Sequence, residues 1–417
     1  MSAFPSSRVT KALIIFLLVC QAAACFKGLG VSLSGRVDLR AFYAAGHIVR
    51  TGHASQLYDY TYQDLVQNDV VSRRVGALPF LYPPFSVALF VPLSMLTYQQ
   101  AFGVIFVANL ALLMLAAMLL APWLPGLCNR SWPMLAFMFG CMFAVSVALM
   151  QGQISFMLLV IYSGAYVLLR KGRNTVAGLV CSLALMKFQL ALPVLLLFII
   201  WRQWRFVRGF LSGAISLGGI SIAIVGPSGL ASYLGSLTTI ASTSSHNAVA
   251  GKARYGMFPS EMPNLHGLSF AMSHGAAWGI VVNVALSALV LGWTLRRRPS
   301  LLTALPAAML ISYHMQPHDL ILLLLPLSFA ANELLLLHHA SSGRRAETQR
   351  RMKLTLSGAA VLLSFPIAAI AMITNHGYLM VVPVVAIWGI GGLTHARQEL
   401  GQIKVSEDAS LPGVFAQ

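Results

Sequence analysis

Charged side chains are scarce in this sequence: they make up only 9% of its 417 residues, while 58% of the residues are hydrophobic. A soluble domain carries roughly 25% charged residues, because it needs a polar surface to stay dispersed in water. The shortage therefore excludes a soluble enzyme and indicates a protein whose solvent is the lipid bilayer. The useful unit of counting is then a membrane span of about 20 apolar residues.

Acidic residues are scarcer still, since 11 Asp and Glu stand against 28 Lys and Arg, a net charge of +17. The basic residues gather in short gaps between apolar runs, which are typical of cytoplasmic loops under the positive-inside rule. Because each cluster is flanked by runs long enough to span a membrane, no nucleic-acid partner is expected. The clusters are Arg8 and Lys11; Arg170, Lys171 and Arg173; Arg202, Arg205 and Arg208; Arg296 to Arg298; Arg344 to Lys353; and Arg397.

Three further motifs are missing. The five cysteines lie in or beside apolar segments and form no Cys-x-x-Cys pair, so no disulfide framework or cysteine metal site is expected. No Asp-x-Asp pair is present to hold a nucleotide-sugar diphosphate through a metal ion, and there is no Walker A loop. Nucleotide sugars and ATP are therefore unsuitable donors, and we expect no cofactor.

The apolar runs predict an all-α, polytopic integral membrane protein with about twelve membrane helices and both termini in the cytoplasm. Residues 1–400 would form one transmembrane domain with external loops at about 34–80 and 226–266, and residues 401–417 a disordered cytoplasmic tail. Residues 82–96 are short and rich in proline, so we expect a helix that dips into the outer leaflet. The expected spans are about 12–33, 99–121, 132–149, 154–170, 206–225, 267–293, 300–316, 318–338, 354–374 and 379–395.

The segment 174–201 has basic clusters at both ends, so both ends should lie in the cytoplasm. Two half-helices that meet inside the membrane near Lys187 satisfy this condition. A lysine at that depth is costly unless it is paired, so we expect it to meet a buried anion such as a lipid phosphate.

Only six acids are expected on the external side: Asp38, Asp59, Asp64, Asp69, Glu261 and Asp319. An external active site that needs a carboxylate base must use one of them. Asp38 is the best placed, because it follows the first span closely and has Arg36 and Arg40 beside it to keep it ionised. The alternative is that Asp38 only forms ion pairs with these two arginines.

Several polar groups near the expected external surface are candidate ligand contacts. Gln151 to Gln153 mark a turn whose amides could bind hydroxyl groups, or could only cap helices. His314, His318 and Asp319 follow one another closely. Their His-x-x-x-His spacing suits a metal, but Pro317 interrupts the helix that would align the two histidines. Contact with a phosphate, or an orienting role, is therefore the better interpretation, and helix-end solvation is the alternative. Weaker candidates are Lys252, Arg254 and Asn264 to Gly267.

Together these motifs resemble glycosyltransferase family 87, over about residues 10–330. The resemblance rests on their order and spacing: Asp38 to Tyr43, Gly52 to Asp59, Tyr82 to Pro84, Gly152 and Gln153, Gly178 to Lys187, and His318 to Leu320. A departure is Met186 to Phe188, where many members have proline soon after the lysine, whereas here Pro193 comes later.

The resemblance implies a GT-C-type fold, a sugar carried on polyprenyl phosphate, mannose being the best-known case, and inverting transfer to a lipid or glycan acceptor without a metal. It maps the catalytic aspartate onto Asp38 and the phosphate-contacting residues onto Lys187 and a histidine of the His314 and His318 pair. Arg40 is a further candidate for the donor phosphate or lipid. The candidate substrate-binding residues are Tyr43, Tyr82, Gln153, Arg254, His266 and Asp319.

The expected location is the cell inner membrane, with the active site on the external or periplasmic face and membrane lipids around it. Two other functions stay open at this point. A transporter or flippase of a lipid-linked sugar would also need a buried lysine and an apolar groove, and a non-catalytic subunit of an envelope-assembly complex would show no transfer by itself.

Overall fold

The computed structural model describes residues 8–73, 76–129, 131–243, 259–337 and 344–395. Within these ranges the chain forms helices and no strands, which confirms the all-α prediction. The α-helices are α1 (Arg8–Leu33), α2 (Leu39–Arg50), α3 (Tyr60–Val70), α4 (Tyr98–Leu120), α5 (Pro125–Cys128), α6 (Trp132–Gly140), α7 (Phe143–Gln151), α8 (Ser155–Arg170), α9 (Asn174–Ser182), α10 (Phe188–Ile200), α11 (Trp204–Thr243), α13 (Leu265–Ser273), α14 (Trp278–Leu295), α15 (Leu301–Ile311), α16 (Leu324–Leu337), α17 (Arg344–Leu362), α18 (Phe365–Ile373) and α19 (Val381–His395). The 3₁₀ helices are η1 (Ala54–Gln56), η2 (Pro84–Leu89), η3 (Pro92–Met95), η4 (Ala121–Trp123), η5 (Leu183–Lys187), η6 (Pro259–Glu261), η7 (Pro317–Leu323) and η8 (Gly377–Met380).

Six helical segments in the described residues are long and apolar enough to cross a membrane. This confirms a polytopic membrane protein, while the total of about twelve membrane helices stays a prediction. The six segments are Ala12–Leu33, Tyr98–Trp123, Asn174–Ile200, Trp204–Thr238, Trp278–Leu295 and Pro317–Leu336.

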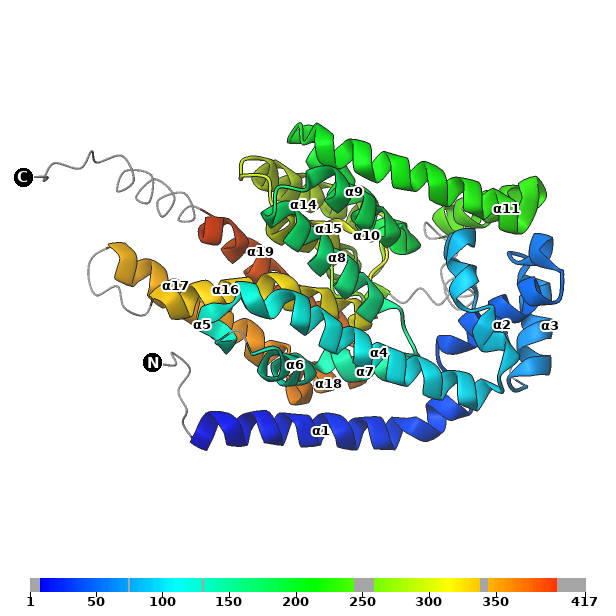
Figure 1. The fold of residues 1–417 in the computed structure, drawn as a ribbon, viewed down its shortest axis with the longest axis horizontal. Coiled ribbons are helices and arrows are strands. Elements are labelled where there is room, and N and C mark those ends of the chain that lie inside the picture. Colours follow the sequence, from blue (N-terminus) through cyan, green and yellow to red (C-terminus); the bar gives the residue numbers. More distant parts are fainter. Residues whose placement is uncertain (1–7, 74–75, 130, 244–258, 338–343, 396–417) are drawn as a thin grey trace, which may run out of the picture.

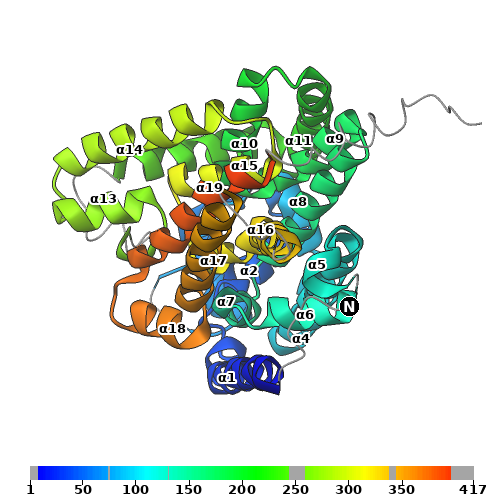
Figure 2. The ribbon, with the colours of Figure 1, turned by 90° about the vertical axis from the view of Figure 1, so that its left-hand side faces the viewer.

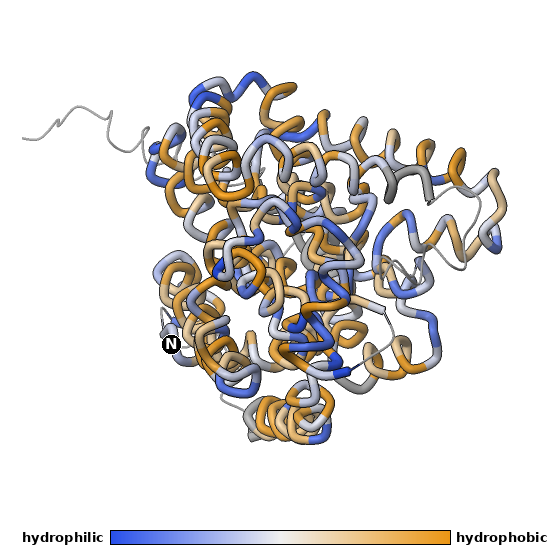
Figure 3. The backbone as a smooth tube through the Cα atoms, turned by 90° about the vertical axis from the view of Figure 1, so that its right-hand side faces the viewer, coloured by the Kyte–Doolittle hydropathy of each residue, from blue (hydrophilic) through white to orange (hydrophobic). Residues whose placement is uncertain are grey.

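The helices form a bundle with a small helical cap at one end (Figure 1). α1 runs along one side and α11 along the opposite side, and α2 and α3 lie at the cap end. Seen from the other end, α16 is central, while α13 and α14 extend to one side (Figure 2). Seen from the cap end, hydrophilic stretches lie between apolar helices (Figure 3). The cap therefore brings polar segments together at one end of a mainly apolar bundle.

The cap is built from the predicted first external loop, which is helical and has a core of its own. Phe42 of α2 stacks on Phe90, with ring centroids 4.6 Å apart, and Phe80 is buried beside them. The expected single helix over 82–96 is wrong: Pro84 and Pro92 each begin a separate 3₁₀ helix, because proline lacks the N–H that a continuous helix needs. Exposed Leu89 and Met95 on these turns leave apolar surface at the rim of the cap.

The segment from α9 to α10 folds back on itself, as the basic ends predicted. The Gly178 backbone of α9 lies against the Phe206 carbonyl of α11, and the Phe198 ring near the end of α10 lies 4.1 Å from the Phe206 ring. A straight helix would separate residues 178 and 198 by about 30 Å. Both therefore reach Phe206 only because the chain reverses at η5, where Lys187 has φ −118° and ψ 73°. Length and hydropathy alone would count this segment as one span.

Three expected spans are interrupted, which corrects the sequence prediction. The span 132–149 breaks into α6 and α7, and the span 354–374 breaks into α17 and α18; the two breaks meet where Phe143 N–H donates to the Leu363 carbonyl over 3.2 Å. The span 267–293 breaks between α13 and α14, where His274 and Gly275 adopt positive φ angles. Each break gives the backbone a local partner or turn, so the polar groups freed from the helix need not face lipid.

α11 extends beyond its expected end at 225. Gly226 has φ 69° and ψ 176°, and Pro227 follows, so the helix bends there and continues into the predicted second loop. After the bend it packs on the cap, where the Tyr233 and Tyr58 rings are 4.8 Å apart.

Candidate active site

Asp38 lies between the end of α1 and the first turn of α2. Its carboxylate does not cap α2. Instead, Oδ2 accepts a 2.5 Å hydrogen bond from the side-chain amide of Gln153, and the Asp38 backbone N–H donates to the side-chain carbonyl of Gln151 over 3.1 Å. The aspartate is thereby held against the turn between α7 and α8, so its carboxylate faces the helical bundle.

The electrostatics of Asp38 depend on burial and on a different cation from those expected. Partial burial raises the pKa of the Asp38 carboxyl, while the hydrogen bond from Gln153 and the charge of Lys187 oppose that rise. Arg40 has the wrong orientation for the expected role beside Asp38, because its guanidinium donates to Gln67, Asn68 and Ser72. The result is a carboxyl group whose pKa lies above the ordinary value for aspartic acid.

Gln153 is fixed from its other side. The Tyr82 hydroxyl donates to its side-chain oxygen over 3.2 Å, and the Asn109 side chain donates to its backbone carbonyl over 3.1 Å. Burial raises the pKa of Tyr82 well above the usual range, so its hydroxyl stays protonated. Gly152, with φ 64°, allows the turn: a Cβ there would lie 2.8 Å from the Leu39 side chain. The amide N–H₂ of Gln153 is consequently directed at the Asp38 carboxylate.

Lys187 lies at the reversal between α9 and α10 and is only 3% exposed. Its ammonium contacts Asp319 Oδ1 at 2.5 Å, His318 Nε2 at 3.0 Å and Ser155 Oγ at 3.5 Å. Asp319 Oδ1 also accepts from Ser155 over 3.0 Å, and its Oδ2 accepts from the Gln316 backbone N–H over 3.2 Å. The buried anion expected for Lys187 is thus present within the protein. Asp319, expected to face outward, is 1% exposed.

The Asp38 and Lys187 groups form one site, because Gln153 and Ser155 lie two residues apart in the same turn. The charge of Lys187 acts on Asp38, and the charges of Asp319 and Asp38 both act on Tyr82. A carboxylate and a buried ammonium therefore face a common region from separate elements.

His314 lies beside this region, in the non-helical stretch between α15 and η7. Its Nδ1 atom is buried and has no hydrogen-bond partner among the described residues. The Tyr313 and His266 rings are 6.0 Å apart, and Asn264, just before α13, donates to the Ser312 carbonyl over 2.6 Å. An unpaired buried nitrogen costs free energy unless a ligand or water satisfies it, so His314 is a candidate ligand contact.

Two sequence candidates lie elsewhere. Arg40 is fully buried within the cap by the contacts described above. The Tyr43 hydroxyl donates to the Leu96 carbonyl over 2.7 Å, and its ring packs against Tyr98. Both side chains hold the cap together in this structure, and their predicted ligand contacts stay predictions. Arg254 lies outside the described residues.

Ser155 and Asn109 join the site without any signal in the sequence. Ser155 is the first residue of α8, where a serine reads as an ordinary helix start, and Asn109 is a single polar residue in the apolar run of α4. Their partners Lys187 and Gln153 are 32 and 44 residues away along the chain. Only the folded arrangement reveals them.

The described residues contain no group of three or more His, Cys, Asp or Glu side chains arranged to hold a metal ion. His318 Nε2 faces Lys187 instead. Because an ammonium has no acceptor capacity, Nε2 is the acceptor and the proton of neutral His318 lies on Nδ1.

In a comparison with protein families, residues 80–326, more than half of the chain, match glycosyltransferase family 87. The chain belongs to glycosyltransferase family 87. No curated protein and no solved structure matches it significantly. The matched region contains Tyr82, Gln153, Lys187, His318 and Asp319, whereas Asp38 precedes it.

The family and the fold together make this protein a membrane glycosyltransferase. Such an enzyme needs a sugar donor and an acceptor. The matched region holds the Lys187 cluster and the Gln153 turn, and Asp38 joins them through its hydrogen bond to Gln153.

Proposed function

We propose that this glycosyltransferase transfers a hexose, such as mannose, from a polyprenyl-phosphate donor to a hydroxyl of a lipid or glycan acceptor, with inversion at the anomeric carbon. The observation that carries the proposal is the meeting of Asp38 and the buried Lys187 cluster at one turn. Transfer from a phosphate requires a base for the incoming hydroxyl and positive charge for the departing phosphate, and these two groups provide them.

In the proposed reaction, Asp38 accepts the proton of the acceptor hydroxyl while the hydroxyl oxygen attacks the anomeric carbon. The new carbon–oxygen bond forms as the bond between the anomeric carbon and the phosphate oxygen breaks. The polyprenyl phosphate leaves with the bonding electron pair and needs no proton from an acid. A single carboxylate is therefore sufficient, unlike the two carboxylates of glycoside hydrolases.

Lys187 and the two histidines would stabilise the charge that develops on the departing phosphate. The raised pKa of Asp38 suits a base, because a carboxylate of higher pKa accepts a proton more readily. The orphaned Nδ1 of His314 and the Nδ1–H of His318 are the available hydrogen-bonding groups. Asp319 would hold Lys187 in place rather than contact the sugar.

The depth of the site supports chemistry on the external side of the inner membrane. Lys187 lies directly before α10, which has 13 residues, and Asp319 lies before α16, which has 14. The opposite ends of these two helices are basic or polar. At 1.5 Å per residue these helices place the site about 20 Å from those ends, within a hydrocarbon core of about 30 Å. If the basic ends are cytoplasmic, the site lies in the outer half of the membrane.

Reconstitution into vesicles tests the proposal. The purified protein receives a polyprenyl-phosphate mannose with labelled sugar, together with lipid acceptors, in the presence of EDTA. We expect label to move to an acceptor and the anomeric configuration of the product to be inverted. Label that crosses the bilayer while still attached to the prenyl phosphate would instead indicate a flippase, and no transfer by the purified protein would favour a non-catalytic subunit.

A further inference from the structure

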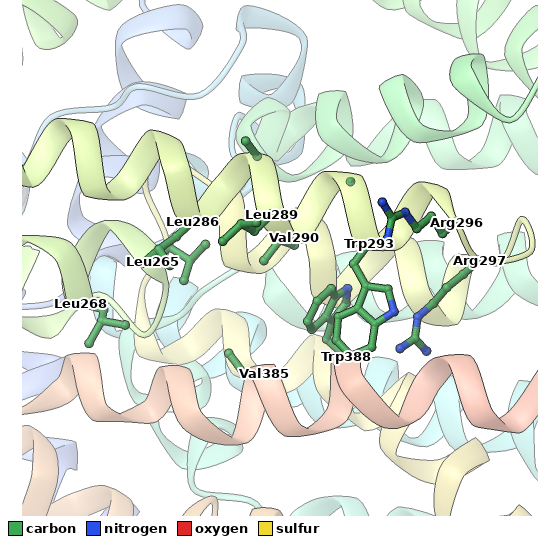
Figure 4. Close-up of a pocket in the computed structure, with 12 residues that line it drawn as sticks. Leu265, Leu268, Leu286, Leu289, Val290, Trp293, Arg296, Arg297, Val385 and Trp388 are labelled. Carbon is green, nitrogen blue, oxygen red and sulfur yellow. The ribbon is translucent and has the colours of Figure 1, made fainter.

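A groove of about 840 Å³ lies between α14 and α19, with Leu265 and Leu268 of α13 at the end opposite Arg296 and Arg297 (Figure 4). We call it the α14–α19 groove. It shares no lining residue with the Asp38 and Lys187 site. Most of its lining is aliphatic, namely Leu265, Leu268, Leu286, Ala288, Leu289, Val290 and Val385.

One end of the groove is basic. Arg296 and Arg297 line it there, directly after the last turn of α14. The Arg297 guanidinium lies 4.5 Å from the ring centroid of Trp293 and 6.0 Å from that of Trp388. Arg297 Nε is buried and has no hydrogen-bond partner among the described residues. No Asp or Glu is among the described residues that line the groove.

The two tryptophans hold Arg297 in place. Trp293 and Trp388 meet edge to face with ring centroids 4.7 Å apart, and Trp388 Nε1 donates to Thr294 Oγ1 over 2.9 Å. Trp293 is 49% exposed, so the stack forms a wall of the groove rather than part of the packed core. Arg297 has no carboxylate partner in the part of the chain that the structure describes, and a cation fixed on aromatic faces in this way is suited to an external anion.

We propose that the α14–α19 groove binds one anionic phospholipid, with its phosphate at Arg296 and Arg297 and an acyl chain along the leucines. Basic pockets between membrane helices are typical sites for anionic lipid headgroups. A polyprenyl phosphate is also anionic, but in the proposed reaction its phosphate lies at Lys187, and a zwitterionic headgroup would bring its own cation beside the two arginines. Charge complementarity therefore selects an anionic lipid of the leaflet at the basic end.

Lipid retention by the full-length protein tests this site. The protein is purified in detergent with equal amounts of phosphatidylglycerol, phosphatidylcholine and a polyprenyl phosphate, and bound lipid is counted by native mass spectrometry. We expect the wild-type protein to retain phosphatidylglycerol in preference to the other two. The double variant Arg296→Gln/Arg297→Gln should lower that retention by about tenfold or more. Arg208→Gln, which removes an exposed arginine of α11 outside the groove, is the matched control and should change nothing.

A second variant keeps both arginines. Gly292 lines the groove, and a Cβ there meets no atom within 4 Å, so Gly292→Phe should fill the groove without disturbing the helix packing. Gly218→Phe, at an equally open position on α11, is its control. We expect only Gly292→Phe to displace the lipid. Unchanged phosphatidylglycerol retention in either groove variant, equal retention of phosphatidylcholine, or preferential retention of polyprenyl phosphate would overturn the proposal.

Discussion

Lys187 and Asp319 neutralise each other's charge inside the bundle. Because of this pairing, their contribution to stability can be measured separately from the proposed role of Lys187 in sugar transfer. With side chains 3% and 1% exposed, both charges have left water. Removing one partner of such a pair is costly, because the other charge stays buried without compensation, by about 3–5 kcal/mol. Replacing both partners costs much less.

We therefore expect Lys187→Met to lower the melting temperature strongly and to abolish transfer. The double variant Lys187→Met/Asp319→Asn should recover most of the stability but none of the transfer, since no cation would face the phosphate. Thermal unfolding in detergent and transfer by the same preparations measure the two effects. Recovery of transfer along with stability would mean that Lys187 serves only the fold.

The pH dependence of transfer should report Asp38. The base acts only when deprotonated, so activity should rise as the pH increases through the pKa of Asp38, which burial raises. The hydrogen bond from Gln153 lowers that pKa. In Gln153→Leu the pKa of Asp38 should therefore rise, and the acidic limb of the pH profile should move to higher pH.

Thr51→Val is the matched control for this profile, since it removes a hydroxyl that donates to the His47 carbonyl in the cap. Its profile should overlay that of the wild type. An acidic limb in Gln153→Leu that stays in place, or moves to lower pH, would show that Asp38 is not the titrating base.

At the residue scale, the sequence indicated which groups to examine but not how they pair. Asp38 could be singled out because only six acids were expected outside, and Lys187 because a charge in an apolar run requires an explanation. The sequence predicts that Asp319 contacts the substrate, whereas in the structure it pairs with Lys187. Its bond to Lys187 joins residues 132 positions apart, a contact that no local pattern encodes.

Among the elements, the α9–α10 hairpin has the most direct consequence for the site, because it carries Lys187. Gly178 lets α9 approach α11 so closely that a Cβ would lie 1.9 Å from the Phe206 carbonyl oxygen. A backbone atom cannot move aside as a flexible side chain can. The position of Lys187 thus depends on a glycine nine residues earlier in the chain.

We expect Gly178→Ala to force the hairpin away from α11, to destabilise the protein by about 1–3 kcal/mol and to reduce transfer. Gly164→Ala is the matched control, because its nearest atom would lie 3.9 Å away in ordinary contact. Thermal unfolding and turnover at saturating donor provide the comparison. Equal behaviour of the two variants would contradict the close approach.

The hairpin was predictable from its two basic ends, whereas the helix breaks were not. Cys141, Met142, Leu363 and Ser364 lie in runs as apolar as any continuous span, so hydropathy cannot distinguish a broken helix from a whole one. The interruption is stabilised by the backbone bond from Phe143 to Leu363 in the isolated bridge between Met142 and Ser364, which exists only after folding. The turn at His274 and Gly275 did carry a signal, since glycine favours a positive φ.

On the scale of the whole molecule, the polar cap and the basic helix ends lie at opposite ends of an apolar bundle. Under the positive-inside rule this polarity predicts that the cap lies outside the cell. Asp69 lies in α3 of the cap and is exposed, and Arg208 lies in the first turns of α11 and is exposed. Because they lie at opposite ends of the bundle, the accessibility of these two positions can show which end faces the outside of the cell.

In a cysteine-free background, Asp69→Cys should react with a membrane-impermeant maleimide added to intact cells. Arg208→Cys should react only after the membrane is permeabilised. Labelling of each protein by mass shift measures the accessibility. The opposite pattern would place the cap in the cytoplasm and contradict an external reaction.

The central claim is that Asp38 is the base of a sugar transfer from polyprenyl phosphate, and one comparison tests it most directly. Wild-type protein and Asp38→Asn are reconstituted in identical vesicles with labelled polyprenyl-phosphate mannose and acceptor, and transfer is followed over time. Loss of a general base costs typically a hundredfold or more in rate. We predict that Asp38→Asn loses transfer to at least that extent while keeping the expression and melting temperature of the wild type. Transfer by Asp38→Asn at close to the wild-type rate would contradict the account.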